Sequence, residues 1–326
     1  MQARLLGETG LQVTPIGIGL AGVGRPAYLG LGRDEDLGGG RSIEFLQRRT
    51  HELLDAASEA GVRYVDAARS YGLAERFLGS WLRDRGRTPG DPTVGSKWGY
   101  TYVGDWSMDA RVHEVKDHSL AALRRQYAES RAELGEHLNL YQIHSATLES
   151  GVLSDLAVLA ELARLKEQGV AIGLSVSGPG QPELIRQSLE VRIDGERVFQ
   201  TIQATWNLLE PSAGAALAEA HQAGYGVIVK ESLANGRLTS RGDSAAGVLG
   251  EIAHRHAVNV DAVAIAAVLA NPWVHVVLSG AIAADQLASN LEALSVNLSA
   301  NELDALAALS EPASTYWSLR HSSPWS

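Results

Sequence analysis

Arg63-Tyr-Val-Asp-Ala-Ala-Arg-Ser-Tyr-Gly-Leu-Ala-Glu-Arg-Phe-Leu-Gly79 is the stretch from which the fold of this chain can be worked out. Its apolar residues 64–65 are typical of a short buried strand, which ends at Asp66. A loop then carries Tyr71, and apolar residues recur at helical spacing from Leu73 onward. An acid is rarely buried without a partner, so Asp66 and Tyr71 are placed for chemistry rather than for packing.

Helices that end in glycine and lead directly into apolar strands recur along the chain. Gly61, Gly169 and Gly224 each precede a β-branched run, and glycine supplies the left-handed turn that this step requires. Strands are expected near 16–19, 64–65, 93–97, 138–144, 170–175, 201–205, 225–230 and 275–278. Helices are expected from Thr50 to Gly61, from about Leu73, and near 117–132, 154–168, 180–190, 212–223, 247–256, 260–270 and 284–293.

Nearly continuous apolar strands that alternate with amphipathic helices favour a parallel sheet covered by helices. Eight such units favour a single-domain (β/α)8 TIM barrel over a doubly wound sheet, and 326 residues is an ordinary length for one. Residues 4–13 predict a short N-terminal hairpin. Residues 21–46, glycine-rich and without periodicity, predict a long loop that is either a lid or disordered. The tail 312–326 would cover the barrel mouth with its aromatic side chains or be disordered.

The composition excludes several classes of function. A net charge of −10 disfavours nucleic acid as a partner, because phosphate binding needs clustered Lys and Arg. No apolar run reaches about 20 residues and the first residues do not form a signal peptide, so no membrane span is expected. Cysteine is absent, which excludes disulfides and a thiolate nucleophile. We therefore predict a cytoplasmic protein that binds no metal, and the sequence does not indicate its oligomeric state.

Polar side chains stand at the carboxyl ends of most of the expected strands. In a (β/α)8 barrel all these ends lie on the face where active sites are found. A set from at least four successive strands, converging at one mouth, is hard to explain by packing. Its members are Asp66, Lys97, His144, Ser175, Gln203, Lys230 and Ser279.

Five motifs, taken together, resemble the aldo-keto reductase superfamily in order and spacing, from about Arg4 to Ala308. They are Asp66-Ala-Ala-Arg-Ser-Tyr71-Gly-Leu-Ala-Glu75, Ser96-Lys97-Trp-Gly, Tyr141-Gln-Ile-His144, Gly173-Leu-Ser175 and Gly280-Ala-x4-Gln286-x3-Asn290. The resemblance implies a barrel that binds extended NADPH and reduces a small-molecule aldehyde or ketone.

The resemblance also implies four catalytic residues. Tyr71 would be the general acid, and Lys97 beside it would lower its pKa. Asp66 would pair with Lys97, and His144 would orient the carbonyl oxygen. Taken singly, each has an ordinary explanation: a helix cap for Asp66, a solvated charge for Lys97, packing for Tyr71 and burial for His144. Their joint occurrence at strand ends favours catalysis.

For the cofactor, the resemblance implies contacts from the last four strands and the helix after them. Ser175 and Gln203 would hold the carboxamide, and Lys230 takes the place of a residue that usually stacks on the nicotinamide. The loop after this strand would carry the pyrophosphate, through Ser232, Leu233, Asn235, Gly236 and Arg237. Ser279 and Gly280 would follow, with Gln286 and Asn290 as adenine contacts. Residues 282–284 offer no group for a 2′-phosphate, so NADH is not excluded.

Substrate contacts are expected from aromatic and polar residues near the mouth: Trp98, Tyr100, Trp206 and Asn207. Such a wall suits an apolar or sugar-like carbonyl compound. Two other functions stay open. One is a binding or regulatory subunit with weak cofactor turnover or none. The other is a dehydratase or isomerase that uses the same Tyr71 and Lys97 pair.

Overall fold

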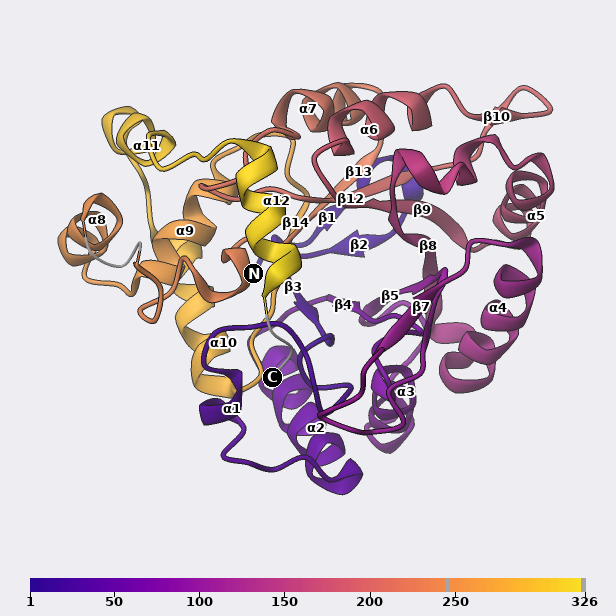
Figure 1. The fold of residues 1–326 in the computed structure, drawn as a ribbon, viewed down its shortest axis with the longest axis horizontal. Coiled ribbons are helices and arrows are strands. Elements are labelled where there is room, and N and C mark those ends of the chain that lie inside the picture. Colours follow the sequence, from indigo (N-terminus) through magenta and orange to yellow (C-terminus); the bar gives the residue numbers. More distant parts are fainter. Residues whose placement is uncertain (244–246, 324–326) are drawn as a thin grey trace.

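Eight parallel strands close into a barrel in the computed structural model, which describes residues 1–243 and 247–323 (Figure 1). The hydrogen-bonded order follows the chain, and the last strand pairs with the first. The strands are β3 (Ile16–Gly19), β4 (Tyr64–Asp66), β5 (Thr93–Trp98), β8 (Leu138–Ala146), β9 (Ala171–Val176), β12 (Thr201–Thr205), β13 (Gly226–Lys230) and β14 (Val276–Ser279). The predicted (β/α)8 TIM barrel is confirmed.

A ring of helices covers the outside of the barrel (Figure 1). α2 begins at Ile43 instead of the expected Thr50, because the Ser42 hydroxyl accepts a hydrogen bond from the backbone N–H of Phe45 and caps the helix. The helices are α2 (Ile43–Glu59), α3 (Ala74–Asp84), α4 (Leu120–Leu134), α5 (Leu156–Glu167), α6 (Gln181–Leu189), α7 (Gly214–Gln222), α8 (Val248–His256), α9 (Val260–Leu269), α10 (Ala284–Leu291), α11 (Ala300–Ala307) and α12 (Ala313–Ser322).

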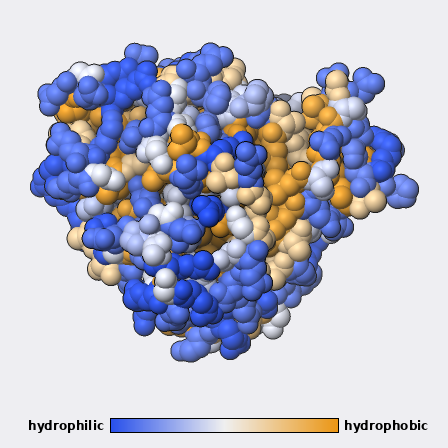
Figure 2. Space-filling model, turned by 180° about the vertical axis from the view of Figure 1, so that it is seen from behind, coloured by the Kyte–Doolittle hydropathy of each residue, from blue (hydrophilic) through white to orange (hydrophobic). Residues whose placement is uncertain are grey.

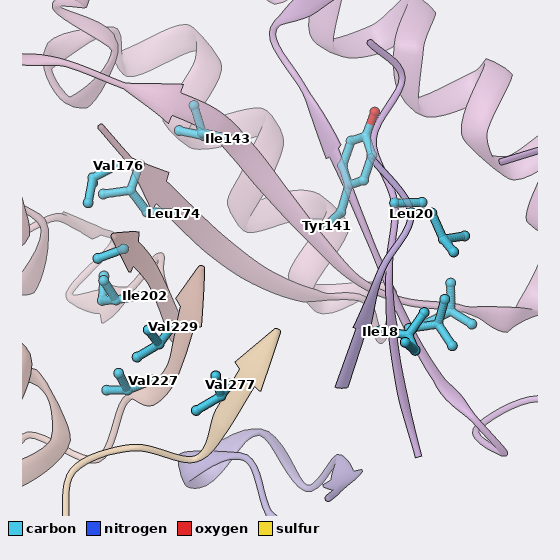
Figure 3. Packing of buried hydrophobic residues seen from close by; sticks show 14 of the residues in the cluster. Ile18, Leu20, Tyr141, Ile143, Leu174, Val176, Ile202, Val227, Val229 and Val277 are labelled. Carbon is cyan, nitrogen blue, oxygen red and sulfur yellow. The ribbon is translucent and has the colours of Figure 1, made fainter. Parts of the chain in front are cut away.

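Side chains alternate between the two faces of the barrel wall, since successive residues of a strand point to opposite sides. On β8, Tyr141 and Ile143 face outward and pack with the helices in the main core cluster (Figure 3). Leu140 belongs instead to the interior cluster, together with Leu6 and Val13. Because of the same alternation, polar residues point into the barrel at the end where the strands finish. These residues make up the site described below.

A hairpin closes the end of the barrel where the strands begin. It consists of β1 (Arg4–Leu5) and β2 (Gln12–Val13), as predicted for residues 4–13. The Thr93 hydroxyl donates to the carbonyl of Gln12 at 2.7 Å, which ties the hairpin to the start of β5. Two smaller hairpins, β6 (Tyr100–Tyr102) with β7 (Glu114–Lys116) and β10 (Arg192–Ile193) with β11 (Glu196–Arg197), extend the connecting loops. The opposite end, where the strands finish, is the end at which the site was predicted.

The glycine-rich segment 21–46 is packed, so the expectation of disorder was wrong. It contains a short helix, α1 (Arg33–Asp36), whose Arg33 is buried. The Arg33 guanidinium donates hydrogen bonds to three backbone carbonyls of the same segment, those of Gly22, Arg25 and Pro26. A guanidinium has five donors in a rigid fork, which lets one side chain hold several turns of a loop together.

The C-terminal tail forms α12, which lies across the front of the barrel in Figure 1. Tyr316 is buried, and its hydroxyl accepts a hydrogen bond from the side-chain amide of Asn207 at 3.1 Å. The described part of the tail therefore covers the mouth. Residues 324–326, with Trp325, lie outside the described residues.

The face behind the view of Figure 1 is mostly hydrophilic. Its apolar side chains gather in a band toward the side that carries α8, α9 and α11 (Figure 2). Within the described ranges, no single helix has the length and apolarity to cross a membrane. α8 and α9 together would meet both criteria, with a 93° bend between them.

Candidate active site

The side chains of Lys97, Asp66 and Tyr71 meet inside the barrel, at the end where the strands finish. Lys97 is buried, and its ammonium group donates to the Asp66 carboxylate, to the Ala67 carbonyl at 2.9 Å and to the Tyr71 hydroxyl at 3.4 Å. The same ammonium lies 4.9 Å from the centre of the Tyr71 ring. Residues 26 and 31 positions apart in the sequence are thus brought into direct contact, because β4 and β5 are neighbours in the barrel.

Asp66 is the hub of the buried hydrogen bonds around this ion pair. It accepts from Lys97, from the Tyr64 hydroxyl at 3.1 Å and from the Gln203 amide at 2.9 Å. Gln142 adds a longer contact of 3.4 Å. A buried carboxylate is costly to desolvate unless such donors surround it, so these bonds hold Asp66 and Lys97 in place.

His144 faces the same tyrosine from β8. Its Nε2 lies 3.5 Å from the Tyr71 hydroxyl, and its Nδ1 lies 3.3 Å from the hydroxyl of Ser70. Burial, followed by the nearby Lys97 ammonium, holds the pKa of His144 well below its ordinary value, so the ring is neutral. If Ser70 donates to Nδ1, Nε2 carries the proton and can donate to a substrate oxygen. The sequence motif contained Ser70 but did not reveal this contact.

The structure corrects the expected electrostatics of Tyr71. Burial, followed by the Asp66 carboxylate, raises the pKa of Tyr71 well above its ordinary value in the ligand-free protein. Lys97 does not reverse this, because its charge is already balanced by Asp66. Tyr71 therefore holds its proton firmly at neutral pH, as a general acid must before the reaction begins.

Arg25 and Tyr28 lie beside Tyr71, and no pattern in the sequence indicated them. The Arg25 guanidinium is buried, 5.6 Å from the centre of the Tyr71 ring and 4.9 Å from that of Tyr28. It donates to the Ser70 carbonyl and to the Glu114 carboxylate, both at 2.8 Å. Both residues come from the glycine-rich segment 21–46, where no periodic pattern shows which side chains point inward. The positive charge of Arg25 counteracts part of the rise in the pKa of Tyr71.

The structure also offers a place for the predicted nicotinamide carboxamide. The buried Ser175 hydroxyl has no hydrogen-bond partner among the described residues, although its neighbour Gln203 donates to Asp66. A buried hydroxyl without a partner is costly, so a bound amide at this position would satisfy it. Lys230 lies on β13 with its ammonium bonded to Ser177 at 2.8 Å, and burial lowers its pKa to about 8. These residues fit the polar end of a nicotinamide.

The loop after β13 is a tight turn with several left-handed residues. Glu231, Ala234, Asn235 and Gly236 have φ between 49° and 96°, and the N–H groups of residues 234, 236 and 237 donate to carbonyls of the same turn. Two predicted contacts there, Ser232 and Leu233, belong to the same turn. The Arg237 side chain is engaged elsewhere, in an ion pair with Glu311.

Three side chains that were predicted as ligand contacts are instead hydrogen-bonded within the protein. Both hydrogens of the Asn207 amide and its oxygen are occupied by the Glu231 carbonyl, the Tyr316 hydroxyl and the N–H groups of residues 209 and 210. The Ser279 hydroxyl donates to Asn290 at 2.7 Å, and Asn290 donates to Asp261 at 2.6 Å. This chain ties β14 to α10 and α9. A side chain whose capacity is filled and whose surface is buried offers a ligand little.

The aromatic contacts divide in the same way. Tyr100 lies at the mouth, with its ring edge-on to His144 at 5.1 Å. Trp98 is fully buried on the outer face of the wall against His118, because Lys97 before it points inward. Trp206 packs edge-on against Trp273 at 5.7 Å. Trp98 is therefore not exposed at the mouth, whereas the half-buried Trp206 stays a predicted substrate contact. Gly280 was predicted as a cofactor contact, and the space where its side chain would stand is open.

An ion pair between α12 and the end of β13 holds the tail over the mouth. The Arg320 guanidinium donates to both oxygens of Glu231, at 2.9 and 3.0 Å from Nε. The carboxylate is 10 % exposed. Arg320 and Lys230 outweigh the effect of burial and lower the pKa of Glu231 to about 2.

This pair predicts a loss of stability in acid. Because the pKa of Glu231 is lower in the folded than in the unfolded protein, its contribution is fully present above pH 4.5. It should be lost as the pH falls toward about 2, and its size is on the order of 2–3 kcal/mol. We expect Glu231→Gln to remove this part of the pH dependence, measured as the free energy of unfolding in urea between pH 6 and pH 2.5.

A matched control is Glu219→Gln, which removes an equally bidentate partner of Arg186 on the exposed surface. Solvent screens such pairs, so this variant should follow the wild-type curve. If both variants lost the same pH dependence, the buried pair would not be its source.

Comparisons with known proteins agree with this geometry. The chain matches the model of the Aldo/keto reductase family over residues 36–311. It is 24 % identical to the aldo-keto reductase ausK of Emericella nidulans, covering 93 % of this chain and 80 % of the relative. It is 25 % identical to the aryl-alcohol dehydrogenase GME11368 of Pestalotiopsis microspora, with the same coverage.

Among solved structures, the holo form of aldo-keto reductase AKR11C1 from Bacillus halodurans has the same fold. The two superpose with a TM-score of 0.72 over 96 % of this chain and 97 % of the other, at 22 % sequence identity. The family match spans most of the chain and includes Tyr71 and the strands that carry Asp66, Lys97 and His144. The chain therefore belongs to the aldo/keto reductase family, whose members are NAD(P)H-dependent oxidoreductases.

Proposed function

We propose that this protein reduces an aldehyde or ketone to the alcohol, with Tyr71 as the general acid. The observation that carries the proposal is the position of the Tyr71 hydroxyl, 3.4 Å from the Lys97 ammonium and 3.5 Å from Nε2 of His144. An oxygen flanked by a cation and an imidazole N–H is suited to hold a proton and deliver it to a substrate oxygen.

Each of the four residues has a separate task in this mechanism. The N–H of His144 orients the substrate carbonyl, whose carbon accepts a hydride while Tyr71 gives its proton to the oxygen. Lys97 stabilises the tyrosinate that remains, and Asp66 holds the Lys97 ammonium in position. A bound reduced nicotinamide would supply the hydride.

Ser175 and the turn after β13 would hold the two ends of the nicotinamide mononucleotide half of the cofactor. The first contact is supported by the Ser175 hydroxyl, which has no hydrogen-bond partner among the described residues, and the second rests on the resemblance to the family. The resemblance implies NADPH, whereas residues 282–284 after β14 provide no basic or hydroxyl group for a 2′-phosphate and so favour NADH.

The mouth favours a substrate with an apolar or aromatic body. Tyr28 and Tyr100 flank the catalytic group, with their rings 6.5 Å from Tyr71 and 5.1 Å from His144 respectively. Aromatic side chains stack well on flat substrates and on the apolar faces of sugars. One relative is named as an aryl-alcohol dehydrogenase, so aryl aldehydes belong in the first panel of substrates.

The test is the transfer of a labelled hydrogen. The purified protein is given NADH or NADPH that carries deuterium at C4, together with aryl, aliphatic and sugar aldehydes. The proposal expects one cofactor oxidised for each alcohol formed, with the deuterium on the carbinol carbon. Conversion of a substrate without oxidation of cofactor would instead indicate a dehydratase or isomerase. Binding of cofactor without turnover of any carbonyl would favour a regulatory role.

A further inference from the structure

Three segments that are distant in the sequence meet at Asp36. Its carboxylate accepts two hydrogen bonds from the Arg241 guanidinium, one of them 2.6 Å long. The same carboxylate accepts from the side-chain amide of Gln286 at 2.7 Å. Asp36 ends α1, Arg241 follows the turn after β13, and Gln286 lies on α10. Figure 1 shows α1 beside the end of α10.

The segment that carries Asp36 crosses the predicted path of the cofactor. The N–H of Leu31 donates to the carbonyl of Asn235 at 3.1 Å, so the segment rests on the turn expected to hold the pyrophosphate. The Gln286 oxygen accepts from the N–H of Ile282 at 3.0 Å, which fixes the amide so that its nitrogen faces Asp36. Asp36 is therefore placed between the predicted pyrophosphate turn and the predicted adenine contact, where the adenosine ribose belongs.

The charges around Asp36 are unfavourable for the 2′-phosphate of NADPH. The Arg241 charge is balanced by Asp36, with which it forms a bidentate pair. Glu35 and Asp285 add negative charge beside Asp36 and Gln286, whereas the charge of Asp34 is balanced by Arg41. Hydrogen bonds from Arg241 hold the pKa of Asp36 below its ordinary value, so its charge persists at neutral pH.

We infer that Asp36 makes this protein select NADH over NADPH. Its carboxylate would accept hydrogen bonds from the 2′- and 3′-hydroxyls of the adenosine ribose, with Arg241 and Gln286 holding it in position. The same carboxylate would repel a 2′-phosphate, as an acidic residue at the ribose does in other dinucleotide-binding proteins. This inference rests on the proposed function, because it requires that the protein bind a nicotinamide cofactor.

The test is the binding of NADH and NADPH to the purified protein, measured by quenching of tryptophan fluorescence and by calorimetry. The wild type is expected to bind NADH at least about tenfold more tightly. Asp36→Asn should strengthen NADPH binding by about tenfold or more, because it removes the repulsion and frees Arg241 to bind the phosphate. Adding Arg241→Ala to Asp36→Asn should abolish that gain.

Glu35→Gln is the matched control. It removes the same charge one residue away, where the side chain is 80 % exposed and 3.9 Å from Arg241. Its ratio of NADH to NADPH affinity should stay that of the wild type, because water screens the lost charge. Thermal melts of all four proteins confirm that each is folded before its affinities are compared.

Two results would overturn the inference while leaving the proposed function intact. The first is a wild-type preference for NADPH, in which case Asp36 merely occupies the phosphate site in the free protein. The second is an unchanged affinity ratio in Asp36→Asn. Failure of the wild type to bind either cofactor would overturn the proposed function and the inference together.

Discussion

Replacing Tyr71 by phenylalanine is expected to lower kcat for carbonyl reduction by about 10²- to 10⁴-fold. The substitution removes one hydroxyl and leaves the ring, so packing against His144 and the position of Lys97 should change little. No other hydroxyl in the site lies between the Lys97 ammonium and His144 Nε2 within the described residues. Cofactor affinity should stay within about threefold, since the predicted cofactor contacts lie on other strands.

Tyr102→Phe is the matched control for this experiment. It removes a tyrosine hydroxyl from β6, where the group accepts a hydrogen bond from the N–H of Trp106 and does not touch the catalytic residues. Its kcat should equal that of the wild type. If Tyr71→Phe kept a comparable kcat, the proton would come from another group, and His144 would be the first candidate to test.

Replacing Lys97 by methionine is expected to impair both catalysis and stability. The Asp66 carboxylate would lose its charged partner in a fully buried position, which costs on the order of 3–5 kcal/mol in comparable buried pairs. The rate should fall as well, because tyrosinate would form beside an unpaired carboxylate instead of a cation. Urea denaturation measures the change in the free energy of unfolding. Steady-state kinetics under conditions in which the variant is folded measures the change in kcat.

A second substitution separates the two effects. Asp66→Asn in the Lys97→Met background removes the unpaired buried charge. The amide oxygen of the new side chain can still accept hydrogen bonds from Tyr64 and Gln203. Stability should recover by a large fraction, whereas kcat should remain low, because the cation beside Tyr71 is still missing. Recovery of both would mean that Lys97 acts only by neutralising Asp66.

Much of this site follows from the order of residues along the strands. Asp66, Lys97 and His144 lie at or near the ends of three strands that are consecutive in the barrel, and parallel strands place such ends at one rim. The alternation of side chains also shows why Trp98 is not at the mouth. Lys97 points inward, so its neighbour must point outward, and this part of the prediction was correctable from the sequence itself.

Other contacts depend on how loops fold back over the barrel. Arg25 and Tyr28 come from a segment without periodicity, and the Arg33 guanidinium decides how that segment folds. Asn207 is a suitable ligand by residue type, yet α12 and the Glu231 carbonyl occupy it. In each case the deciding partner is far away in the chain and does not belong to a strand or helix with a repeating pattern.

The sequence by itself determined the barrel and its catalytic rim, because periods of two and 3.6 residues are local and show which side of each element is buried. Only the tertiary structure decided that Asp36 meets Arg241, 205 positions away, and Gln286, 250 positions away. Contacts of that kind depend on the path of loops over a closed barrel, and no local pattern records the distance between two loop side chains.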